Sequence, residues 1–357
     1  MLSPSEFREL VSGRRRGPVA TLLRCGLRVV EVPYTAAVRW RNRRFDNGAK
    51  TIHRVGVPVV SVGNLTLGGT GKSPMVHWIA KWLRKKGLSV TIISRGYGSD
   101  SSGENDEALE LKQKLPDVPH LQNPDRVAAA EEAIKKHGCE VILLDDAFQH
   151  RRIARDLDIA LIDALEPFGF DHVFPRGTLR EPVEGLARAD VVVLSRADML
   201  DEALREEIRR RAQGYAPQAA WVEVRHAADS LVSGKGTVEP LESLKGRPVA
   251  AFCGIGNPAG FRHTLSECGF EVVTMREFPD HHRYTSADVA SLESWAAGLD
   301  IEAVVCTQKD IVKLDVENLG NCPLRAVSIG MDILAGEERL EAALAKETDR
   351  RVRRDAP

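Results

Sequence analysis

Short apolar runs alternate with helix-like segments from residue 57 to residue 194. The runs of strand length are Val57–Val62, Val90–Ser94, Val141–Leu144, Ile159–Ile162 and Val191–Leu194. Between them, Ser73–Lys86 and Pro124–Lys136 have the spacing of amphipathic helices. Strands that are apolar along their whole length and alternate with helices indicate a parallel sheet covered on both faces. The carboxyl ends of such strands meet at one edge, where ligands bind.

A second α/β pattern follows a stretch rich in Gly, Ser and charged residues. Its predicted strands and helices are Pro248–Cys253, Pro258–Cys268, Val272–Phe278, a helix from Ser286, and Ala303–Thr307. The predicted divisions are a leader (1–54), a first domain (55–226), a linker (227–246), a second domain (247–340) and a charged C-terminal tail (341–357). A chain of 357 residues is long enough for two domains with separate cores.

The leader combines apolar and basic residues. Its apolar run, 19–40, is interrupted by Arg24, Arg28 and Glu31, which predict one polar stripe on a helix rather than a simple membrane span. Such a basic amphipathic helix, near Trp40, favours contact with an anionic membrane surface through residues 1–45. The alternative is a helix that packs its apolar side on the protein's own core.

Charge strengthens the membrane hypothesis. The net charge of the whole chain is −1, but residues 1–54 carry twelve Arg and Lys side chains against four acidic ones. A basic leader on an acidic body suggests an anionic partner.

The six cysteines include no C-x-x-C pair, which argues against zinc and for a reducing compartment. The ten histidines show no metal-binding spacing.

A glycine-rich loop separates the first predicted strand from the first predicted helix. It consists of Thr66, Gly68, Gly69, Thr70, Gly71, Lys72 and Ser73. Glycines let backbone N–H groups curl around phosphate oxygens, Lys72 can reach the outer phosphates, and the Ser73 hydroxyl can ligate Mg²⁺. Thr66 stands where the usual motif has its first glycine. The loop predicts a nucleotide triphosphate site in a phosphate-loop NTPase-type fold; the alternative is a glycine-rich turn.

Two adjacent acids, Asp145 and Asp146, end the strand that begins at Val141. In a phosphate-loop enzyme an acid at this place holds Mg²⁺ opposite the loop hydroxyl. The alternative is a helix N-cap followed by an exposed acid. Taken alone, Asp106 is a first-turn acid of a helix, and the pair His281 and His282 is a solvent-exposed pair.

Together these motifs resemble one enzyme family. They are Ser61-Val-Gly-Asn-Leu-Thr-x-Gly-Gly-Thr-Gly-Lys-Ser-Pro74, Ser94-Arg-Gly-Tyr-Gly98, Asp106-Glu107, Leu144-Asp-Asp-Ala-Phe-Gln-His-Arg151, Pro175-Arg-Gly-x-Leu-Arg-Glu-Pro182 and Phe278-Pro-Asp-His281. In this order, from about residue 55 to residue 310, the chain closely resembles the tetraacyldisaccharide 4'-kinases, which act in lipid A biosynthesis.

The resemblance implies an Mg²⁺-dependent transfer of the γ-phosphate of ATP to the 4'-hydroxyl of a tetraacyl glucosamine disaccharide 1-phosphate. It implies two α/β/α domains joined by a short β linker, and a peripheral enzyme at the cytoplasmic face of the inner membrane. Lys72 and Ser73 match the family's phosphate-loop Lys and Thr, and Asp145 and Asp146 match its acidic pair. Asp106 matches the base, although residues 105 and 108 depart from the family's Gly and Pro.

The resemblance also makes His281 the partner of Asp106. It implies a general place near ligands for Tyr97, Glu107, Gln149, His150, Arg180 and Glu181. No nucleic acid and no protein partner is implied. Two alternatives stay open: a phosphate-loop GTPase or metallochaperone, suggested faintly by Ser195-Arg-Ala-Asp198, and a peripheral lipid-binding protein with an inactive nucleotide site.

Overall fold

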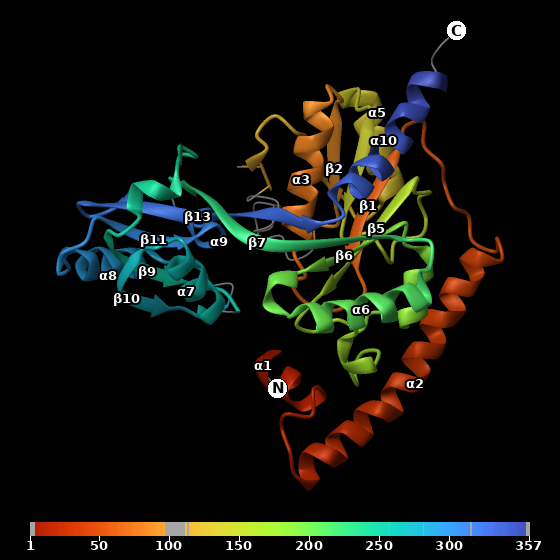
Figure 1. Ribbon diagram of the computed structural model, residues 1–357, viewed down its shortest axis with the longest axis horizontal. Coiled ribbons are helices and arrows are strands. Elements are labelled where there is room, and N and C mark those ends of the chain that lie inside the picture. The colour runs from red at the N-terminus through yellow and green to blue at the C-terminus, as the bar shows by residue number, and fades with distance from the viewer. Residues whose placement is uncertain are drawn as a thin grey trace. The chain divides into compact units, whose positions relative to one another are not determined.

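The computed structural model describes residues 4–96, 111–112, 114–256, 258–280, 282–314 and 316–354 (Figure 1). The chain forms two compact units. The first consists of Met1–Arg95, Val118–Arg225 and Asp332–Pro357, and the second of Gly96–Asp117 and His226–Met331. The chain passes between them in the neighbouring strands β7 (Ala220–Val232) and β13 (Cys322–Ala335).

A parallel sheet forms the first unit. Its strands are, in spatial order, β7, β6 (Val191–Ser195), β5 (Leu157–Asp163), β1 (Val59–Asn64), β4 (Val141–Asp145), β2 (Val90–Ser94) and β3 (His120–Gln122). Every residue of β1, β2 and β4 is buried, so both faces of the sheet are covered, as their apolar sequences predicted.

Helices cover these strands. They are α3 (Lys72–Lys85), α5 (Arg126–His137), α6 (Glu202–Tyr215) and α10 (Glu337–Arg354), with 3₁₀ turns η1 (Gly169–Asp171), η2 (Val183–Arg188) and η3 (Ala197–Met199). In the first unit, α5 packs on β1, β2 and β4, whereas α6 packs on β5 and β6. Figure 1 shows α3 and α6 on opposite sides of the strands.

Two leader helices precede the sheet: α1 (Pro4–Val11) and α2 (Pro18–Asp46). Pro18 at the first turn of α2 costs no intrahelical hydrogen bond, and the helix continues through Pro33 for 29 residues. In Figure 1, α2 runs along the outside of the first unit.

The second unit has its own parallel sheet, in the order β10 (Glu271–Glu277), β9 (Pro248–Cys253), β11 (Ala303–Thr307) and β13. Its remaining elements are η4 (Leu241–Leu244), α7 (Pro258–Glu267), α8 (Ser286–Ala297), α9 (Gln308–Ile311), and the short strands β8 (Val238–Glu239) and β12 (Asn318–Leu319). Two apolar clusters form its core.

Two predicted divisions differ from the observed elements. The predicted linker, 227–246, contains the second half of β7, all of β8 and η4, and β7 ends in two buried residues, Leu231 and Val232. The predicted tail begins inside α10, where Leu340 and Leu344 are fully buried and Trp82 Nε1 donates to Glu341 Oε1 at 2.8 Å.

Candidate active site

The glycine-rich loop connects β1 to α3, as predicted. Gly71 takes the left-handed conformation (φ 83°) directly before α3, which begins at Lys72. The loop therefore ends at the N-terminus of α3, where backbone N–H groups and the positive end of the helix dipole can bind an anion. Gly63, near the end of β1, lets the turn after β4 approach closely: a Cβ there would lie 2.6 Å from Phe148 N.

Lys72, Asp146 and Arg180 form a charged cluster beside this loop. Lys72 Nζ lies 3.5 Å from Asp146 Oδ1, and Arg180 Nη1 donates to both Asp146 oxygens at 2.9 Å. Burial opposes ionisation of Asp146, but the two cations outweigh it and hold the pKa of its carboxyl below the ordinary value. Asp146 is therefore a carboxylate at neutral pH. Its neighbour Asp145, at the end of β4, is buried.

A second ion pair supports the loop from the other side. Arg196 Nη1 pairs with Asp163 Oδ2 at 2.5 Å, and its Nη2 donates to the Gly69 carbonyl at 2.7 Å. Leu67 N donates to Thr178 O at 2.7 Å. Sequence reasoning considered Arg196 only as part of a weak guanine motif. No local signal identifies this role, because it depends on the left-handed backbone of Arg196 (φ 56°) and on residues more than 30 positions away.

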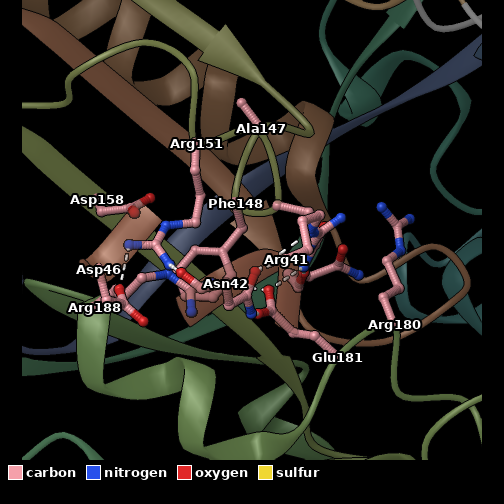
Figure 2. A network of polar contacts seen from close by, with 12 residues as sticks. Arg41, Asn42, Asp46, Ala147, Phe148, Arg151, Asp158, Arg180, Glu181 and Arg188 are labelled. Carbon is pink, nitrogen blue, oxygen red and sulfur yellow. Dashed lines mark hydrogen bonds and ion pairs between the residues drawn. The ribbon is translucent and has the colours of Figure 1, made fainter. Parts of the chain in front are cut away.

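Glu181 lies at the centre of a buried polar network (Figure 2). Its side chain is fully buried. Oε1 accepts hydrogen bonds from Gln149 Nε2 at 3.0 Å and Arg188 Nη2 at 2.8 Å, while Oε2 accepts from Asn42 Nδ2 at 2.9 Å. Gln149 Nε2 also donates to Asn64 O, 2.9 Å away at the end of β1. The network thus connects α2 with the start of the glycine-rich loop.

This network gives Glu181 a structural role. Its carboxylate has no exposed surface and accepts hydrogen bonds from three protein donors, so it holds other elements in place, while its place near ligands stays a prediction. Gln149 has the same character, since its amide joins Glu181 to β1. Arg151 adds a parallel connection: it donates to Asn42 O at 3.0 Å and to Asp46 Oδ1 at 2.6 Å.

His150 lies half-buried between several arginines. Burial, and then the positive charges of Arg126, Arg152 and Arg155, lower the pKa of its imidazole to about 4. The ring is therefore neutral near pH 7. Arg126 is itself buried, and attraction to Asp145 and Asp146 acts against the burial that lowers the pKa of its guanidinium.

The structure therefore brings together most of the residues predicted in the first unit: Thr66, Gly68, Gly69, Thr70, Gly71, Lys72, Ser73, Asp145, Asp146, Gln149, His150, Arg180 and Glu181. Tyr97, Asp106, Glu107 and His281 lie outside the described residues. His282 is described, and its Nε2 lies 3.3 Å from Asp288 Oδ2.

Helix α2 has an unusual orientation. Glu31, part of its polar stripe, is buried and accepts from Val173 N at 2.9 Å and from Arg28 Nη1 at 2.7 Å. Apolar side chains face outward instead, with Leu22 74 %, Val29 72 % and Trp40 62 % exposed. The apolar side therefore does not pack on the protein's own core, as the alternative interpretation required.

A groove of about 620 Å³ lies between α2 and residues 171–184. Its walls combine apolar, basic and acidic side chains; they include Val32, Trp40 and Leu179, the arginines Arg28, Arg39 and Arg43, and the acids Glu31, Asp171 and Glu184. Among the helices of the described residues, none has an apolar stretch long enough to cross a bilayer.

Comparisons with known proteins identify one enzyme family. The family model described as Tetraacyldisaccharide-1-P 4'-kinase matches residues 23–349. Tetraacyldisaccharide 4'-kinase of Anaeromyxobacter dehalogenans (strain 2CP-C) is 41 % identical over 353 residues, covering 93 % of this chain and 92 % of that protein. The Geobacter sulfurreducens protein of the same name is 34 % identical, with 95 % and 98 % covered.

A solved structure gives the same result. LpxK from Aquifex aeolicus, crystallised in complex with ATP, superimposes with a TM-score of 0.74 at 28 % identity, covering 91 % of this chain and 99 % of that one. These matches favour neither the GTPase nor the inactive lipid-binding alternative. By its sequence, its fold and the charged cluster at its glycine-rich loop, the chain belongs to the tetraacyldisaccharide-1-P 4'-kinase family.

Proposed function

We propose that this chain transfers the γ-phosphate of ATP to the 4'-hydroxyl of a tetraacyl glucosamine disaccharide 1-phosphate. The observation that carries the proposal is the cluster of Lys72, Asp146 and Arg180 beside a phosphate-type loop, in a chain of this family. Phosphoryl transfer depends mainly on positioning and on neutralising charge, which is what this cluster supplies.

The loop and Lys72 bind the triphosphate in this proposal. Only 11 % of the Lys72 side chain is exposed, and its short ion contact is with Asp146, so the ammonium already points into the charged cluster. The backbone N–H groups that precede α3 bind phosphate oxygens. Arg180, which holds Asp146 from the other side, fixes the direction of that carboxylate.

The oxygen donors here fit Mg²⁺. Within the described part of the chain, no group of three or more His, Cys, Asp or Glu side chains could hold a metal ion. Mg²⁺ does not need one, because it is usually bound by one or two carboxylates together with substrate phosphates and water. Ser73, Asp145 and Asp146 would hold the ion, which supplies neutralisation of phosphate charge when it is bound.

Asp106 would accept the proton of the 4'-hydroxyl, and His281 would orient it and tune its basicity. In the reaction, the 4'-oxygen bonds to the γ-phosphorus, the bond to the β-phosphate oxygen breaks, and ADP leaves. Tyr97 and Glu107 are proposed to lie near the acceptor. Support for these assignments comes from the motif resemblance of the sequence.

The outward side of α2 would place the enzyme on an anionic membrane surface. Four acyl chains cannot leave a bilayer easily, since each CH₂ transferred to water costs ~0.8 kcal/mol. The enzyme must therefore reach its acceptor there, peripherally, at the cytoplasmic face of the inner membrane. The exposed apolar residues of α2 suit acyl chains, and the arginines among the charged residues of the groove suit the phosphate of the acceptor.

The test is incubation with [γ-³²P]ATP, Mg²⁺ and the tetraacyl disaccharide 1-phosphate in mixed micelles. We expect a lipid product that carries a second, labelled phosphate. An acceptor that lacks the 4'-hydroxyl serves as the control and should stay unlabelled. No labelled lipid with the intact acceptor, or equal labelling of both acceptors, would overturn the proposal.

A further inference from the structure

Helix α1 precedes the residues that match the family model, yet it is docked on the first unit. Leu10 and Val11 at its end are buried. Arg176 Nη1 donates to Val11 O at 2.9 Å, and the rings of Phe7 and Phe174 lie 6.1 Å apart. These contacts fix the position of the helix beside the phosphate-type loop.

From α1, the Arg8 side chain reaches Gly68 in that loop. A Cβ at Gly68 would lie 2.6 Å from Arg8 Nη2, which is closer than real Cβ atoms come to other atoms. Gly68 also has a φ of 112°, a backbone conformation that residues with a side chain rarely adopt. The guanidinium of Arg8 therefore occupies the space that any other residue at position 68 would fill.

Arg8 retains hydrogen-bonding capacity at this place. Its side chain is 49 % exposed, and among the described residues its ion contact is with Glu166, from Nε to Oε1 at 3.6 Å. Burial of Glu166 outweighs this attraction, so the pKa of the Glu166 carboxyl is raised. Arg180 and Arg196, in contrast, each make short hydrogen bonds at 2.9 Å or less. The Nη groups of Arg8 are thus available at the rim of the loop.

Charge develops on the oxygens of a phosphoryl group during its transfer, and an arginine supplied from outside the loop can stabilise that charge. Gly68 lies four residues before Lys72 on the same loop. We propose that Arg8 is a catalytic residue that donates hydrogen bonds to the transferred phosphoryl group, as an arginine finger within the same chain. The inference rests on the proposed kinase function, and Arg8 itself neither forms nor breaks a covalent bond.

The test compares Arg8→Ala and Arg8→Lys with Arg16→Ala, which removes the same charge from an exposed position of the leader. With saturating acceptor in mixed micelles, we expect Arg8→Ala to lower kcat by roughly 10²–10³ while changing the KM for ATP little. Arg8→Lys should have little more activity than Arg8→Ala, because lysine lacks the planar guanidinium group. Added guanidinium ion should restore part of the activity of Arg8→Ala.

Glu166→Gln separates catalysis from docking of α1. This variant removes the ion partner of Arg8 but keeps the guanidinium, so its kcat should stay much closer to that of the wild type. Thermal unfolding of each variant shows whether the fold is intact. The Arg8 proposal is overturned if Arg8→Ala matches Arg16→Ala, if its loss lies only in the KM for acceptor, or if Glu166→Gln loses as much. A wild-type protein without any transfer overturns the proposed function itself.

Discussion

The strands of the first unit and helix α2 use apolar and charged side chains in opposite ways. In β1 and β4 apolar side chains are buried, and Asp146, directly after β4, meets the cation of Lys72. In α2 the acid Glu31 is buried against Val173 N, while Leu22 and Val29 face outward. The sheet edge is thus organised by contacts within the chain, whereas α2 exposes an apolar surface of the kind that marks interaction sites.

The two regions are nevertheless connected. Asn42 of α2 and Gln149 beside β1 bind the same carboxylate, that of Glu181. A movement of α2 on a membrane would therefore act directly on the residues that hold the loop. Substitutions can nevertheless separate the chemistry of the sheet edge from the delivery of the acceptor by α2.

The largest effect is expected from Asp106→Ala. Loss of a general base should lower kcat by about 10²–10⁴ and leave the KM for ATP almost unchanged, since the donor site is untouched. Steady-state kinetics with micellar acceptor measure both constants, with Asp106→Asn as the isosteric comparison. A near-normal kcat for Asp106→Ala would remove the residue from the mechanism.

Glu181→Ala should destabilise the fold by about 3–5 kcal/mol, because it removes a fully buried carboxylate and leaves the partly buried Arg188 without its ion partner. Urea unfolding gives the free energy. Glu184→Ala is the matched control: its exposed carboxylate lies 3.4 Å from Arg39 and should change stability by less than about 0.5 kcal/mol. Equal losses of unfolding free energy in the two variants would mean that the buried carboxylate of Glu181 stabilises the fold no more than an exposed one.

Replacing Leu22, Val29 and Trp40 of α2 together by Ser should weaken binding to anionic vesicles by at least about 100-fold, since each buried apolar side chain contributes roughly 1.5 kcal/mol or more. Co-sedimentation measures the binding. Val238→Ser, an equally exposed apolar position in the second unit, is the control and should bind normally. Unchanged sedimentation of the triple variant would show that α2 is not the membrane contact.

The smallest effect concerns His150. Because its folded-state pKa, about 4, lies below the ordinary value of 6.5, the unfolded state binds a proton more readily between these values. Stability should therefore fall as the pH drops from about 6.5 to about 4. The melting temperature of the wild type relative to His150→Asn should decline over that range; a constant difference would contradict the burial of a neutral ring.

The sequence predicted the sheet and much of the site for a physical reason. Continuous apolar runs such as Val141–Leu144 can only be buried, and parallel topology then brings Asp146 to the edge that carries Lys72. The contacts of Arg8 and Arg196 could not be predicted, because they join residues distant in sequence through side-chain geometry. The sequence of α2 predicted a polar side and an apolar side, but not which side faces the protein. That choice depends on His172 and Val173, which contact the buried carboxylate of Glu31.

In the proposed function the sheet edge transfers phosphate while α2 delivers the lipid. The transfer rate of the α2 triple Ser variant, relative to wild type, tests this division with the same acceptor in anionic vesicles and in detergent micelles. We expect a loss of at least about tenfold in vesicles and a near-normal kcat in micelles. An equal loss in both media, or none in either, would contradict it.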